Sequence, residues 1–148
     1  MKKLIFILLL LIYLAMSNLM QGQTSVPLDE VENKLTENPK YIVIEFYTDW
    51  CGICAIQQNK IRKDEDLVGK LENEFYYVKF NAETKDSFRF NGYLFENKNR
   101  IHDFAKAFFP DELGFPAWVI LNRDMEIVFQ WTGLMESDEL DFVLKQIL

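Results

Sequence analysis

Cys51 and Cys54 are the residues of this chain whose type and spacing most directly indicate chemistry. They are its only two cysteines, they are separated by Gly52 and Ile53, and they closely follow the apolar run 41–47. Two thiols at this spacing can form a disulfide and open it again. A bridge that closes so short a loop removes little conformational entropy from the unfolded chain, so it would stabilise the fold only slightly. The pair therefore favours redox chemistry over structural cross-linking.

The residues around the cysteines predict the strands and helices that position them. Residues 41–47 are apolar and β-rich, which indicates a central strand of an α/β sheet covered on both faces. A helix is expected from about residue 53, interrupted by three acidic residues before a second segment at 67–74. The run 75–81 would form a strand parallel to the first through this crossover. Cys51 is thus expected at a helix start, where unpaired N–H groups and the helix dipole favour thiolate over thiol.

The rest of the chain predicts further helices and strands around one sheet. Aromatic residues alternate on either side of Asn91 and Gly92, a dipeptide that suits the two-residue turn of a β-hairpin. The other expected elements are a helix over 29–37 ended by Pro39, the small hairpin insert around 87–96, a helix over 101–109, strands over 117–121 and 126–131, and a final helix capped by Ser137.

The N-terminal residues predict export. Lys2 and Lys3 precede the apolar stretch 4–16, a combination typical of a secretory signal peptide. As a helix this stretch would be roughly 20 Å long, shorter than a hydrocarbon core of about 30 Å, although an uncleaved anchor is the alternative. We expect a signal peptide at 1–22, one domain at 23–148, and a periplasmic or secreted location.

The charge of the chain restricts its partners. The formal net charge is −7, and removal of residues 1–22 would take away two lysines and no acid, which gives −9. An anionic surface argues against nucleic acid or anionic lipid as a partner.

Four features beyond the cysteines carry a resemblance to a known family. Glu45 lies six residues before the first cysteine, Lys-Phe-Asn occupies 79–81, Leu-Gly-Phe-Pro occupies 113–116, and Gly133 precedes the last expected helix. The chain after about residue 26 therefore resembles thioredoxin-fold proteins. The resemblance implies an α/β fold with a central mixed β-sheet flanked by helices on both faces.

A narrower similarity is to the secreted thioredoxin-like proteins of Bacteroidetes-type bacteria. It rests on residues 79–83, 90–92 and 102–105. It implies an exported redox protein.

The family resemblance assigns roles to the titratable residues. Cys51 would attack a substrate disulfide, and Cys54 would resolve the resulting mixed disulfide. Glu45 would be a buried carboxyl that relays a proton to or from Cys54, with Lys79 as a further candidate catalytic residue. The alternative is that Glu45 is a partly exposed acid paired with Lys79.

The same resemblance assigns the substrate-binding residues. Pro116 is expected after a cis peptide bond, and Phe115 would present its backbone to an extended substrate segment. Trp50 would shield the disulfide or, alternatively, pack in the core. His102, the only histidine, is expected to serve packing or to lie at the surface rather than to take part in chemistry. The hairpin aromatics are expected in the core rather than at a docking surface.

The dipeptide between the cysteines bears on the redox poise. Thioredoxin has Gly-Pro there, whereas Ile53 retains a backbone N–H that can donate toward the Cys51 thiolate. Because this stabilises the reduced form, we expect a reduction potential above the −270 mV of thioredoxin, at about −250 to −170 mV.

The leading hypothesis is an exported thiol-disulfide oxidoreductase, a reductase or isomerase without a bound cofactor. Its partners would be proteins with disulfides or thiols and a membrane redox protein that reloads the pair. One alternative is a carrier of a soft metal ion such as Cu(I) held by the two thiolates. Zinc fits poorly because a structural site requires four ligands. Another alternative is a redox-inert docking module on the same scaffold.

Overall fold

The computed structural model describes residues 25–148, and the signal peptide expected at 1–22 lies outside this part of the chain. Its elements are α2 (Leu28–Glu37), β1 (Tyr41–Tyr47), α3 (Gly52–Lys63), α4 (Glu65–Asn73), β2 (Phe75–Asn81), β3 (Phe88–Phe90), β4 (Tyr93–Phe95), α5 (Asp103–Phe108), β5 (Ala117–Leu121), β6 (Ile127–Thr132) and α6 (Ser137–Ile147). None of the helices within residues 25–148 is long and apolar enough to cross a membrane.

Four of the strands form one mixed sheet in the order β2-β1-β5-β6. β1 pairs with β2 in parallel and with β5 in antiparallel orientation, and residues 42–46 of β1 are fully buried. The parallel pair is joined through α3 and α4, as a crossover requires. The expected central strand and the expected α/β architecture are both confirmed.

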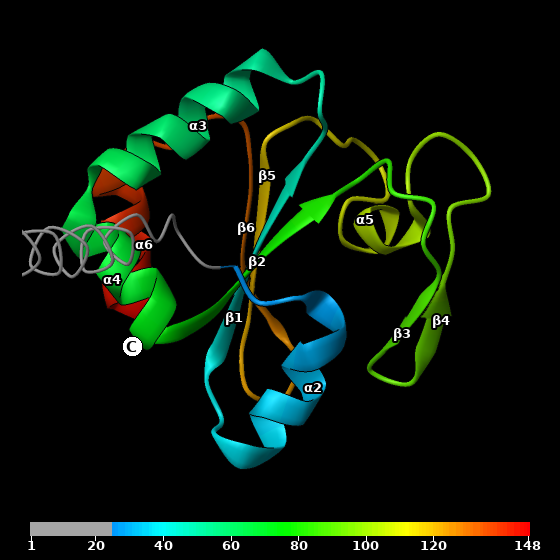
Figure 1. The fold of residues 1–148 in the computed structure, drawn as a ribbon, viewed down its shortest axis with the longest axis horizontal. Helices are drawn as coiled ribbons and strands as arrows, with labels where there is room; N and C mark the ends of the chain where they lie inside the picture. Colours follow the sequence, from blue (N-terminus) through cyan, green and yellow to red (C-terminus); the bar gives the residue numbers. More distant parts are fainter. Residues whose placement is uncertain (1–24) are drawn as a thin grey trace, which may run out of the picture.

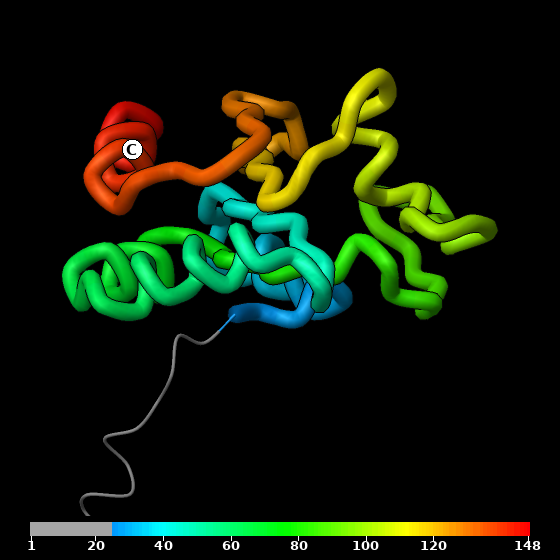
Figure 2. The backbone as a smooth tube through the Cα atoms, turned by 90° about the horizontal axis from the view of Figure 1, so that it is seen from above, coloured from blue at the N-terminus to red at the C-terminus, as the bar shows by residue number. Residues whose placement is uncertain are grey.

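Helices cover both faces of this sheet (Figure 1). Helices α3, α4 and α6 bury apolar side chains on one face, around Ile61, Leu71 and Leu144. On the other face lie α2, α5 and the β3–β4 hairpin, which bury Val31 and Phe104. Figure 2 shows the first group of helices at one end of the view and the hairpin segment at the other.

The hairpin insert is anchored by an aromatic cluster around Phe104. The Phe104 ring centroid lies 5.1–5.8 Å from six other rings. These rings are Phe46, Phe80, Phe88, Phe90, Phe95 and Phe108. The predicted turn is present, with φ of 49° at Asn91 and 79° at Gly92. Three hairpin phenylalanines thus join the core as expected, whereas Tyr93 at the turn is 69% exposed.

The predicted starts of α4, α5 and α6 are wrong. Helix α4 begins at Glu65 instead of residue 67, because the Asp64 side chain caps it by accepting a hydrogen bond from the Leu67 N–H at 3.0 Å. Helix α5 begins at Asp103 instead of residue 101, because His102 is its N-cap and Nδ1 of its ring accepts a hydrogen bond from the Phe104 N–H at 3.1 Å. His102 is buried and stacks on Phe88, so its packing role is confirmed. Helix α6 is capped by Glu136 and not by Ser137, because the Glu139 side chain accepts a hydrogen bond from the Glu136 N–H at 2.9 Å.

We predict that Phe104→Ala lowers the free energy of unfolding by about 3–5 kcal/mol, because it removes a fully buried ring that joins the hairpin to the sheet. Urea unfolding followed by circular dichroism measures the change. Tyr93→Ala is the matched control and should stay within about 0.5 kcal/mol of wild type, since that ring is exposed. Equal losses in the two variants would contradict the anchoring role of Phe104.

Candidate redox site

Cys51 and Cys54 form a disulfide at the start of α3, with their Cα atoms 5.2 Å apart. Cys51 is the N-cap of this helix, and its sulfur accepts a hydrogen bond from the Cys54 N–H at 3.1 Å. The bond expected from the Ile53 N–H is not the one observed; the donor is the N–H of Cys54, the next residue along the helix. The sulfur of Cys51 still faces the helix N-terminus, where a thiolate is favoured once the bridge is reduced. Cys51 is 8% exposed and Cys54 is 3% exposed.

The proline loop lies next to the disulfide. The Phe115–Pro116 peptide bond is cis, as expected. The Pro116 carbonyl accepts a hydrogen bond from the Gly133 N–H at 2.7 Å, and Gly133 has a φ of 110°, a backbone conformation that side-chain-bearing residues rarely adopt. This bond ties the loop to the end of β6.

A groove of about 430 Å³ opens beside the disulfide, and we call it the disulfide groove. It is lined by Trp50, Cys51, Gly52, Ile53, Arg100, Ile101, Leu113, Gly114 and Phe115. All three residues expected to act in substrate binding are thus near the cysteines: Trp50 and Phe115 line the groove, and Pro116 follows directly. Arg100 and Ile101 come from the segment between β4 and α5, and sequence reasoning did not identify them.

Trp50 is held in place although 61% of it is exposed. Its indole N–H donates to Glu83 Oε2 at 3.0 Å, and its ring meets the Phe115 ring edge-on with centroids 6.4 Å apart. The Arg100 guanidinium lies 5.4 Å from the Trp50 ring centroid and donates from Nε to Glu83 Oε1 at 2.9 Å. These hydrogen bonds from Arg100 and Trp50 lower the pKa of Glu83. The core-packing alternative for Trp50 is wrong, because its ring lies at the surface of the groove.

Glu45 is fully buried in β1, so the expected alternative of a partly exposed acid is wrong. One carboxyl oxygen accepts hydrogen bonds from the Tyr77 hydroxyl and the Gln58 side-chain amide. The other oxygen has no hydrogen-bond partner within residues 25–148. Burial raises the pKa of Glu45, and the bonds from Tyr77 and Gln58 and the charge of Lys79 oppose this only in part. Because Gln58 follows Cys54 by one helical turn, Glu45 contacts the helix that carries the second cysteine.

Lys79 lies beside Glu45 in the register of β1 and β2. Its ammonium sits 5.3 Å from the centroid of the Tyr47 ring. In the part of the chain that the structure describes, Lys79 forms no ion pair with Glu45, so its influence on the carboxyl is through space.

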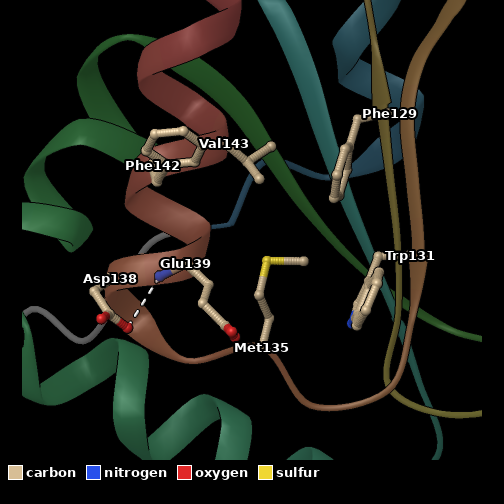
Figure 3. Close-up of a pocket in the computed structure, with 7 residues that line it drawn as sticks. All are labelled: Phe129, Trp131, Met135, Asp138, Glu139, Phe142 and Val143. Atoms are coloured by element: carbon tan, nitrogen blue, oxygen red, sulfur yellow. Dashed lines mark hydrogen bonds between the residues drawn. The ribbon is translucent and has the colours of Figure 1, made fainter.

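A second pocket lies away from the cysteines, between β6 and α6 (Figure 3). It has a volume of about 490 Å³ and is lined by Phe129, Trp131, Met135, Asp138, Glu139, Phe142 and Val143. Figure 3 shows Phe129 and Trp131 on the strand side and Phe142 and Val143 on the helix side. None of these residues is a thiol, so the redox chemistry belongs to the disulfide groove.

We predict that the free energy of unfolding of Glu45→Gln, relative to that of wild type, increases as the pH rises. Below the ordinary carboxyl pKa of about 4.5, Glu45 holds its proton in both the folded and the unfolded state, so its ionisation does not lower the free energy of unfolding there. At higher pH the unfolded state ionises first, because burial raises the pKa in the folded state, and wild type loses stability until the folded-state pKa is passed.

Urea unfolding of both proteins between about pH 4 and pH 8 measures this difference. Glu74→Gln is the matched control, because Glu74 is exposed, and its effect should change less with pH than that of Glu45→Gln. A stability difference between Glu45→Gln and wild type that is constant over this range would contradict the burial of an acid with a raised pKa.

Comparison with known proteins agrees with this geometry. A family model described as a thioredoxin-like domain matches residues 28–148, whereas no sequence among the curated proteins matches the chain. Among solved structures, a mutant thioredoxin from Halobacterium salinarum NRC-1 is 22% identical, with a TM-score of 0.52 over 84% of this chain and 86% of that one.

Two further solved structures resemble the chain. A disulphide isomerase from Xylella fastidiosa Temecula1 is 19% identical, with a TM-score of 0.56 over 80% of this chain and 88% of that one. A structure named DsbH oxidoreductase is 15% identical, with a TM-score of 0.61 over 84% of this chain and 83% of that one. At these identities the structures share the fold, and the family match over residues 28–148 supplies the assignment: the chain belongs to the thioredoxin-like domain family.

Proposed function

We propose that this protein is an exported thiol-disulfide oxidoreductase that reduces or isomerises disulfides of other proteins with Cys51 and Cys54. The observation that carries the proposal is the disulfide itself, which caps α3 and borders an open groove beside the cis Pro116 loop. An extended substrate segment in that groove would bring its own disulfide to the Cys51 sulfur.

The reaction moves two electrons from the cysteine pair to the substrate. The Cys51 thiolate attacks one sulfur of the substrate disulfide, forms a mixed disulfide and displaces the first substrate thiolate. Cys54 then loses its proton and attacks the Cys51 sulfur, which forms the Cys51–Cys54 disulfide and displaces the second substrate thiolate. Both substrate thiolates take up protons, so the substrate is reduced and the protein is oxidised.

In its ionised form, Glu45 is suited to accept the Cys54 proton in the second step. It is buried, its pKa is raised, and one of its oxygens has no hydrogen-bond partner within residues 25–148. We assign Lys79 a supporting role, because its charge lowers the pKa of Glu45. The Glu45→Gln variant tests the relay as well as stability, because a relay requires that the pH profile of disulfide exchange change in this variant.

A Cu(I) carrier would have to use the same two sulfurs. Within residues 25–148 no cluster of three or more His, Cys, Asp or Glu side chains could hold a metal ion. His102 is also committed, because its Nδ1 accepts from Phe104 and its Nε2 lies 2.9 Å from the Asp86 carbonyl oxygen. No observation favours metal carriage over disulfide exchange.

The direction of the reaction depends on the redox poise. We predict a reduction potential of about −250 to −170 mV, above that of thioredoxin, because Ile53, unlike proline, keeps a backbone N–H that can donate to the Cys51 thiolate once the disulfide is reduced. Equilibration of residues 23–148 in glutathione buffers, followed by thiol trapping, measures the value. A potential near −250 mV assigns reductase work with a membrane protein that reloads the pair, and one near −180 mV or higher assigns isomerase or oxidase work. A value of about −280 mV or lower contradicts the prediction.

We further predict that Cys54→Ser accumulates mixed disulfides with protein substrates, because the resolving thiol is missing. Cys51→Ser should accumulate none and should lose insulin-reducing activity to the background rate. Non-reducing gels and mass spectrometry of the trapped species measure this. Equal trapping by both variants would contradict the assigned roles. Stoichiometric Cu(I) binding by wild type without any disulfide-reducing activity would contradict the proposed function.

A further inference from the structure

The disulfide groove contains one cation, Arg100, that the chemistry at sulfur does not require. Arg100 reaches the groove from the segment between β4 and α5, and its side chain is 73% exposed. Its Nε atom is used by Glu83, but within residues 25–148 its two terminal amino groups have no hydrogen-bond partner. These two groups are free to donate hydrogen bonds to a ligand that enters the groove.

The guanidinium is already oriented before anything binds. It lies over the Trp50 ring, with its central carbon 5.4 Å from the ring centroid, and bonds to Glu83, and Trp50 is in turn held by Glu83 and Phe115. A long side chain held in this way loses little rotamer freedom when it forms further hydrogen bonds. The arrangement is therefore suited to recognition of a ligand.

The chemistry of the groove defines the ligand. The planar guanidinium fork matches a carboxylate, which it can bind with two parallel N–H···O bonds. Next to it, Ile53, Leu113 and Phe115 offer apolar surface. The formal charge of −7 repels acidic molecules in general, so an acid is favoured only where it makes this close contact.

We propose that Arg100 is a specificity-determining residue that selects substrates with an acidic side chain beside the reactive cysteine. The substrate class is a protein segment in which Asp or Glu flanks the cysteine and an apolar residue follows. This inference rests on the proposed function and names the substrates of the same site.

Rates with matched peptide disulfides test the proposal. Each probe is a symmetric disulfide of one short peptide, with either Glu or Gln next to its cysteine. The reduced protein, freed of excess reductant, is the electron donor. Each protein molecule reacts once. The reaction breaks the peptide disulfide, forms the Cys51–Cys54 disulfide and releases two peptide thiols, which chromatography quantifies. An ionic strength of about 0.15 M screens the long-range repulsion.

The readout is the ratio of the Glu-peptide rate to the Gln-peptide rate. We expect this ratio to fall about fivefold in Arg100→Gln, and by a smaller factor in Arg100→Lys, which keeps the charge but not the fork. Arg89→Gln is the matched control, because Arg89 is an exposed cation of β3 that does not line the groove. Its ratio should equal that of wild type.

Two results would overturn the proposal and leave the proposed function intact. One is an equal ratio in wild type and Arg100→Gln with both rates unchanged. The other is an equal ratio with both rates lowered together, which would mean that Arg100 acts only by fixing Trp50. If wild type reduces neither peptide and does not reduce insulin, the proposed function fails instead.

Discussion

Strand β1 has a hydrogen-bonded neighbour on each side, and this double pairing brings the cysteines, Glu83 and the proline loop to one edge of the sheet. Its parallel partner β2 continues into the segment that supplies Glu83. The Ala82 N–H donates to the Tyr47 carbonyl at 2.8 Å, which holds this segment beside the end of β1. Its antiparallel partner β5 begins opposite that same end, since Ala117 pairs with Phe46, and so the cis proline loop arrives beside the cysteines. The chain leaving β1 turns into α3 and brings the cysteines to the groove, and the segment between β4 and α5 adds Arg100 and Ile101.

Two carboxyl groups near the cysteine pair differ in their surroundings. Glu45 is desolvated inside the sheet layer, which raises its pKa and favours the protonated form. Glu83 is bonded to Arg100 and to the Trp50 indole, which lowers its pKa and keeps it ionised. The first is suited to exchange a proton with a thiol, and the second is suited to hold neighbouring side chains in place. The pKa values of two carboxyl groups thus move in opposite directions because one is buried and the other is bonded to Arg100 and Trp50 at the surface.

The sheet and the cysteine site could be predicted because their signals are contained in short stretches of sequence. Residues 41–47 are continuously apolar, the cysteines are three apart, and Asn91-Gly92 specifies its own turn. The cap of α6 was missed because Glu139 reaches back to Glu136, a side-chain interaction that competes with the more obvious Ser137. The contacts of Glu83 and Arg100 with Trp50 were missed because residues so distant in sequence meet only after the insert folds onto the sheet. The Tyr77 and Gln58 contacts of Glu45 have the same origin.

In the segment between β2 and α5, the residues that pack in the core are different from those that line the disulfide groove. Phe88, Phe90 and Phe95 pack against Phe104, whereas Arg100 stands at the rim of the groove. Strands β1 and β5 and the cysteines belong to other parts of the chain. On the proposed function, the rim around Arg100 can therefore be changed to alter which substrates bind, while the aromatic contacts that anchor the segment and the cysteine pair are left as they are.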